Sequence, residues 1–152
     1  MAKNLNSTAY RKIDVDALDD DKFEDGGEEN GTNEGVDERT VNGLLQSGRN
    51  VEALHCVLSN APMGSKVEQN MKDKATAIVA RVLQSFKGGE VEKAVGELND
   101  TEADTLIKFV YRAFEILAEG ALCQSLLQWH AQICAKFGKG PIVRTLSSRT
   151  RL

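Results

Sequence analysis

The chain has 152 residues, of which 41% are hydrophobic and 28% charged, values that are ordinary for one soluble domain with a tail. It holds no apolar run of about 18 residues and no apolar stretch near its start, so we expect neither a membrane-spanning helix nor a secretory signal. Three scattered cysteines, Cys56, Cys123 and Cys134, are too few for a disulfide framework. We expect them to be reduced, small buried residues of an intracellular protein.

The net charge of −4 is unevenly distributed along the chain. Residues 1–38 carry four basic and twelve acidic side chains, whereas residues 39–152 carry fifteen basic and eleven acidic ones. The segment 120–152 has no acidic residue and five basic ones, Lys136, Lys139, Arg144, Arg149 and Arg151. Such asymmetry is typical of interaction tails and partner-binding surfaces. A solubilising acidic tail on an ordinary domain would give the same composition.

The stretch YRKIDVDALDDDKFED, residues 10–25, is acidic but also carries spaced apolar side chains, namely Tyr10, Ile13, Val15, Leu18 and Phe23. They are too sparse to form a core, so they indicate an extended arm that orders on a partner. Residues 24–38 are acidic and rich in glycine and asparagine, which is typical of a flexible linker. We therefore expect a flexible acidic arm and linker at residues 1–38 and a helical domain at residues 39–152.

The second part has the three- and four-residue apolar spacing of helices, without the alternation of a β-hairpin. Gly138 is predicted to end the sixth helix, and Pro141 suits the first position of the seventh. Short connections predict an all-α fold, a compact array of about seven helices with an extended, acidic N-terminal arm. The predicted helices cover residues 38–47, 51–60, 65–86, 90–98, 101–117, 121–137 and 141–148.

Three of these helices begin with recognisable capping patterns. Asn50 is predicted as the N-cap of the second helix. Ser65 with Glu68 has the spacing of a capping box for the third, and Thr101 with Asp104 has similar spacing for the fifth.

The acidic arm does not fit a calcium-binding loop. An EF-hand loop needs oxygen ligands at positions 1, 3 and 5 and a glycine at position 6. If the loop started at Asp14, these last two positions would hold Leu18 and Asp19. A start at Asp19 is worse, since it places Phe23 and Glu24 there. We expect no calcium site.

His130 and Cys134 lie four residues apart and share one face of a predicted helix. No Cys-x-x-Cys pair accompanies them, and Cys123 would lie about 10 Å away along the axis, too far to share a zinc ion. Both residues fall on the apolar arc, where a thiol is inert unless it is exposed and electropositive. We therefore expect a packed helix face, no metal, no cofactor and no enzyme, with a thiol enzyme using Cys134 and His130 as a remote alternative. The GKG at residues 138–140 lacks the other residues of a P-loop.

The basic C-terminal segment is a weak candidate for binding nucleic acid. Residues 39–152 have a net charge of only +4, and no aromatic residues alternate with the bases. An acidic protein partner suits these bases at least as well, so we expect neither nucleic acid nor a membrane as partner.

Five segments, in order along the chain, carry a family resemblance. They are residues 10–25, FKGGEVEKAVGELN at 86–99, IKFVYRAFE at 107–115, SLLQWH at 125–130 and GPIVRTLSSRTRL at 140–152. Together they resemble the family of the smallest subunit, subunit 5, of the actin-related protein 2/3 complex. The match covers most of the chain, with the linker as its weak part.

The resemblance implies an all-helical, non-catalytic structural subunit of a seven-protein complex that nucleates branched actin filaments from the sides of existing ones. The helical body would dock on complex subunits 4 and 1 through the helices containing Trp129 and Arg144. A cytoplasmic and cytoskeletal location, in actin-rich cell projections, is also implied. The N-terminal arm would tether actin-related protein 2 through Arg11, Lys12, Ile13, Val15, Asp16 and Phe23. A free-standing helical adaptor with an acidic binding arm is the alternative.

Overall fold

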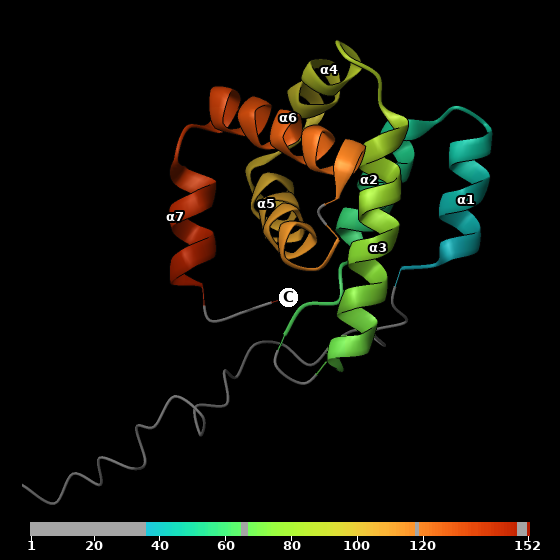
Figure 1. Ribbon diagram of the computed structural model, residues 1–152, viewed down its shortest axis with the longest axis horizontal. Helices are drawn as coiled ribbons and strands as arrows, with labels where there is room; N and C mark the ends of the chain where they lie inside the picture. The colour runs from blue at the N-terminus through green and yellow to red at the C-terminus, as the bar shows by residue number, and fades with distance from the viewer. Residues whose placement is uncertain (1–35, 65–66, 118, 149–151) are drawn as a thin grey trace, which may run out of the picture. The chain divides into compact units, whose positions relative to one another are not determined.

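The computed structural model describes residues 36–64, 67–117, 119–148 and 152. Over these residues the chain forms seven α-helices and no strand (Figure 1), which confirms the predicted all-α array. None of the helices in these ranges is long and apolar enough to cross a membrane. The helices are α1 (Glu38–Gln46), α2 (Asn50–Ser59), α3 (Gln69–Ser85), α4 (Glu90–Glu97), α5 (Asp100–Ile116), α6 (Gly120–Phe137) and α7 (Gly140–Ser147).

Helix α5 is at the centre of this array. It packs against α2, α3, α6 and α7. Figure 1 looks nearly along α5, with α7 on one side of it and α3 on the other. Four large apolar side chains of α5 are fully buried, because apolar residues at three- and four-residue spacing cover a wide face of the helix. They are Leu106, Ile107, Phe109 and Val110.

The first residues of α5 form a capping box that differs from the predicted one. The Glu102 N–H donates to Asn99 Oδ1 at 2.8 Å, and the Asn99 N–H donates to Glu102 Oε2 at 3.0 Å. The prediction of Thr101 with Asp104 was therefore wrong by two residues. The helix begins earlier because Asn99 and Glu102 together satisfy two backbone donors at its start.

The starts of α2 and α3 also differ from the predicted ones. Helix α2 includes Asn50, with Arg49 at the N-cap and no side-chain bond to the cap. The Asn50 side chain instead donates to the carbonyl oxygen of Ser85 at 3.4 Å. Helix α3 begins at Gln69, four residues after the predicted Ser65, which lies outside the described residues. Long-range bonding of Asn50 thus replaces the local cap that the sequence predicts.

The end of α6 matches its prediction. Gly138 has φ 67°, a conformation that glycine adopts without strain, and its N–H donates to the carbonyl oxygen of Cys134 at 3.0 Å. Lys139 then serves as the N-cap of α7, and Pro141 lies in the first turn of that helix, as predicted. The short link makes α7 fold back against α5.

Candidate protein-binding surfaces

Helix α7 exposes two large apolar side chains next to each other. Val143 is 60% exposed and Leu146 is 78% exposed. They are three residues apart, so they lie on one face of the helix. Pro141 is the only buried residue of α7, and Ile142 packs against the core while half-buried. Exposed apolar residues are ordinary when scattered singly, but here two large ones lie three residues apart on one eight-residue helix.

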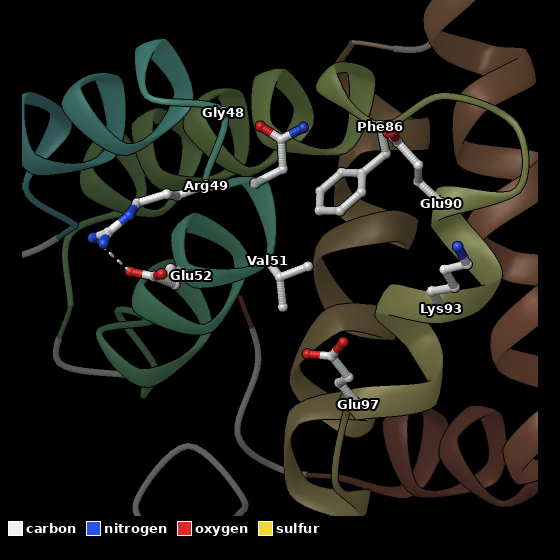
Figure 2. A pocket seen from close by; sticks show the side chains of 9 residues that line it. Gly48, Arg49, Val51, Glu52, Phe86, Glu90, Lys93 and Glu97 are labelled. Atoms are coloured by element: carbon white, nitrogen blue, oxygen red, sulfur yellow. Dashed lines mark hydrogen bonds and ion pairs between the residues drawn. The ribbon is translucent and has the colours of Figure 1, made fainter.

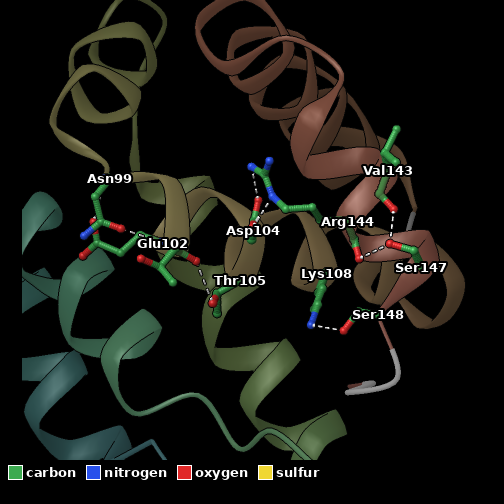
Figure 3. Close-up of polar contacts among 10 residues, drawn as sticks. Asn99, Glu102, Asp104, Thr105, Lys108, Val143, Arg144, Ser147 and Ser148 are labelled. Atoms are coloured by element: carbon green, nitrogen blue, oxygen red, sulfur yellow. Dashed lines mark hydrogen bonds and ion pairs between the residues drawn. The ribbon is translucent and has the colours of Figure 1, made fainter.

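Polar contacts connect α7 to α5 (Figure 3). Arg144 donates from Nε to Asp104 Oδ2 at 2.6 Å and from Nη2 to Asp104 Oδ1 at 2.9 Å, a two-bonded ion pair. The hydrogen bonds that Arg144 donates to Asp104 raise the pKa of Arg144 above its ordinary value. Lys108 Nζ donates to Ser148 Oγ at 3.1 Å, and burial lowers the pKa of Lys108. Charged and polar groups therefore help to hold α7 against α5, together with Pro141 and Ile142, and its apolar pair is left facing outward.

A groove of about 300 Å³ lies between the start of α2 and α4 (Figure 2). Val51 and Phe86 supply its large apolar side chains, and Arg49 pairs with Glu52 at 3.2 Å. Three carboxylates and two cations surround it, so its charge is close to balanced. The lining residues are Gly48, Arg49, Asn50, Val51, Glu52, Phe86, Glu90, Lys93 and Glu97. They include no nucleophile beside a base, so the groove offers no catalytic arrangement.

The His130 and Cys134 pair belongs to a contact between α5 and α6. Tyr111 Oη lies 3.2 Å from His130 Nε2, while Cys134 Sγ is 3.8 Å from His130 Nδ1. Burial, and secondarily Cys134, raises the pKa of Tyr111. All three cysteines of the chain are half-buried free thiols. In the described ranges no group of three or more histidine, cysteine or acidic side chains is placed to hold a metal ion.

Trp129, predicted as a partner-binding residue, lies in the protein's own core. Its side chain is fully buried, with Nε1 donating to the Leu83 carbonyl oxygen at 3.2 Å. The ring meets Phe86 edge-on, with 5.1 Å between centroids. Trp129 therefore has no surface to offer, and any docking by α6 must use other side chains. Arg144, the other predicted body residue, is exposed but already paired with Asp104.

The predicted arm residues, Arg11, Lys12, Ile13, Val15, Asp16 and Phe23, lie outside the described residues. The structure adds Val143 and Leu146, which the sequence analysis did not select. Their sequence signal is the segment PIVRTLSS, where Ile142, Val143 and Leu146 form one apolar stripe about 100° wide. The sequence does not say whether the body or a partner covers that stripe.

Comparison with known proteins supports the resemblance of the five segments. The family model described as ARP2/3 complex 16 kDa subunit (p16-Arc) matches residues 9–152. The chain is 42% identical over 149 residues to actin-related protein 2/3 complex subunit 5-C of Xenopus laevis, covering 98% of each chain. It is 40% identical over 148 residues to the probable subunit 5 of Caenorhabditis elegans, covering 97% of this chain and 100% of that one. It is 38% identical over 152 residues to the subunit 5-like protein of Homo sapiens, covering 98% of each. The chain thus belongs to the family of the 16 kDa subunit of the ARP2/3 complex.

Proposed function

We propose that the chain is a structural subunit of the actin-related protein 2/3 complex, in the position of subunit 5. The observation that carries this proposal is the extent of the similarity, which runs from residue 9 to residue 152 and so includes both the acidic arm and the helical body. The family consists of structural subunits, so the chain is not an enzyme. It acts through contacts, as part of the actin cytoskeleton in the cytoplasm, including actin-rich cell projections.

The arm, within residues 1–38, tethers actin-related protein 2. Ile13, Val15 and Phe23 are its apolar anchors, each worth roughly 1.5–3 kcal/mol when fully buried on the partner. Arg11, Lys12 and Asp16 give polar contacts that set the position of the arm. The glycine-rich linker at residues 24–38 gives the arm its reach.

The helical body, residues 39–152, docks on complex subunits 4 and 1 through the helices α6 and α7, which contain Trp129 and Arg144. The exposed apolar pair of α7 supports this role, because such side chains gain free energy when a partner covers them. The assembled complex then starts daughter filaments from the sides of existing ones.

The test is purification of the tagged full-length chain from cells, with identification of its stoichiometric companions. We expect the two actin-related proteins and the other subunits of the complex. Their absence would contradict the proposal.

The excess of acid in residues 1–38 favours a second candidate, a free-standing adaptor whose arm binds basic partners.

Substitutions in the arm separate these two candidates. Replacing Ile13, Val15 and Phe23 by alanine should weaken assembly more than replacing Asp19, Asp20 and Asp21 by asparagine. The adaptor predicts the reverse order and strong weakening by salt.

A further inference from the structure

Helix α7 is attached to α5 on one side, and its opposite side exposes the apolar residues Val143 and Leu146. Isolated helices of eight residues are marginal in water, so α7 needs support from its surroundings. Arg144 and the half-buried Ile142 provide that support, through Asp104 and the core respectively. Val143 and Leu146 contribute little to it, since most of their surface is in solvent. Exposed apolar side chains of this size are typical of a surface that another protein covers.

The segment that forms α6 and α7 is basic in sequence, whereas α5 places Asp104 against Arg144. No acidic residue occurs between Gly120 and Leu152. Within α6 and α7, Lys136 donates to three backbone carbonyls and Arg144 is neutralised by Asp104, which leaves the exposed Lys139 at the start of α7. In sequence, Arg149 and Arg151 follow directly after α7. A partner surface complementary to this one is apolar at its centre and acidic at its rim.

We infer that α7 is the docking element of the helical body, and that it inserts Val143 and Leu146 into an apolar groove with an acidic rim on another subunit of the complex. This inference rests on the proposed function and narrows it, because it assigns docking to the outer face of α7. Leu127, the exposed leucine of α6, is outside this interface. Asp104 supports docking indirectly, by holding Arg144 and thereby the orientation of α7.

The test uses the full-length chain, fluorescently labelled, and a complex assembled from the other six subunits. We compare the wild type with the double variant V143D/L146D and with L127D, a matched change at another exposed apolar residue. The double variant should bind at least about tenfold more weakly, and L127D about as tightly as the wild type. If circular dichroism shows that the aspartates disturb folding, the variant V143S/L146S is used instead. It should also bind more weakly than the wild type.

The outcomes separate this inference from the proposed function. If the wild type itself does not bind the six-subunit complex, the proposed function fails. If the wild type binds and the double variant binds equally well, the inference alone fails. A loss from L127D as large as that from the α7 variant would overturn the assignment to α7.

Two further measurements test the chemistry of the partner. Lys139→Glu should weaken binding and reduce its dependence on salt, whereas Lys74→Glu on α3 should change neither. If K139E bound as tightly as the wild type at every salt concentration, the partner would have no acidic rim at this position. Sedimentation of the isolated wild type should show a monomer, and a dimer that V143D/L146D disrupts would overturn the inference in favour of a second copy of this chain.

Discussion

The indole Nε1 of Trp129 donates a hydrogen bond of 3.2 Å to the carbonyl oxygen of Leu83. Leu83 is in the last turn of α3 (Gln69–Ser85), where carbonyl groups have no partner within the helix. Ser125 Oγ donates to the same oxygen at 3.3 Å. Helix α6 therefore caps α3 with two side chains, and the only tryptophan of the chain stabilises the body from inside.

Removing the indole N–H should destabilise the body modestly, and removing the ring should destabilise it severely. Trp129→Phe should lower the free energy of unfolding by about 1 kcal/mol, beyond the change in packing, because Ser125 still donates to Leu83. Trp129→Ala should lower it by about 3–5 kcal/mol. Urea unfolding followed by circular dichroism measures both. Leu127→Ala, at an exposed site of the same helix, is the control and should cost less than Trp129→Phe.

Lys136 performs a similar capping function for α4. Its Nζ donates to the carbonyl oxygens of Val95, Gly96 and Leu98 at 3.0, 2.8 and 2.8 Å. These groups lie at and just beyond the end of α4 (Glu90–Glu97), where a cation also complements the helix dipole.

Lys136→Met keeps much of the aliphatic chain but removes all three hydrogen bonds. We expect the free energy of unfolding to fall by about 1–2 kcal/mol, because part of the site is open to water. Amide hydrogen exchange should also become faster in α4. Lys74→Met, on the exposed side of α3, is the matched control. If both variants lowered the free energy of unfolding equally, the three hydrogen bonds of Lys136 would not stabilise the fold.

The helices themselves could be predicted because their signal is local. The predicted segment 121–137 differs from α6 (Gly120–Phe137) by a single residue, since apolar spacing and Gly138 both belong to the sequence around it. The start of α5 was misplaced because Asn99 with Glu102 and Thr101 with Asp104 have the same spacing. Asparagine caps better than threonine, and the longer glutamate side chain reaches back to the N-cap N–H, so the first pair forms the box.

The roles of individual surface and core side chains could not be predicted, because they depend on residues far away in the sequence. Trp129 contacts Leu83, 46 residues earlier, and Lys136 contacts carbonyls about 40 residues earlier. The apolar arc of α6 is visible in the sequence, but which part of it faces the core depends on where α3 and α5 lie. The inward side of α7 could not be predicted either, because Arg144 on that helix pairs with Asp104, 40 residues earlier in the sequence.

The pair between His55 on α2 and Glu102 on α5 makes stability depend on pH. His55 Nδ1 lies 2.7 Å from Glu102 Oε1, and the Glu102 side chain is largely buried. Burial raises the pKa of Glu102, but hydrogen bonds from the Asn99 N–H and from His55 outweigh it, and the net pKa is lowered. Glu102 therefore stabilises the folded state above the ordinary glutamate pKa of about 4.3, and this contribution is lost as the pH falls through the lowered folded pKa.

Glu102→Gln removes the charge while keeping the shape and an acceptor oxygen. At pH 7 the variant should be less stable than the wild type by about 1 kcal/mol, and the difference should shrink as the pH falls below about 4. Urea unfolding at a series of pH values measures it. Glu52→Gln, in an exposed pair with Arg49, is the control and should show a smaller difference at every pH. A difference for Glu102→Gln that stayed constant down to pH 3 would contradict this explanation.

The ion pair between Asp104 and Arg144 should control how firmly α7 is held against α5. Asp104→Asn keeps the volume of the side chain but leaves a neutral group with one acceptor oxygen, so the two-bonded ion pair is lost. Amides of α7 (Gly140–Ser147) should then exchange severalfold faster, while those in the centre of α5 stay as slow as before, because the core does not depend on this pair. Glu38→Gln, which disrupts the exposed pair with Arg81, is the control and should leave α7 unchanged. If α7 exchanged at the wild-type rate in Asp104→Asn, the packing of Ile142 would be its main attachment. A faster rate would mean that Asp104 holds α7, and with it Val143 and Leu146, against α5.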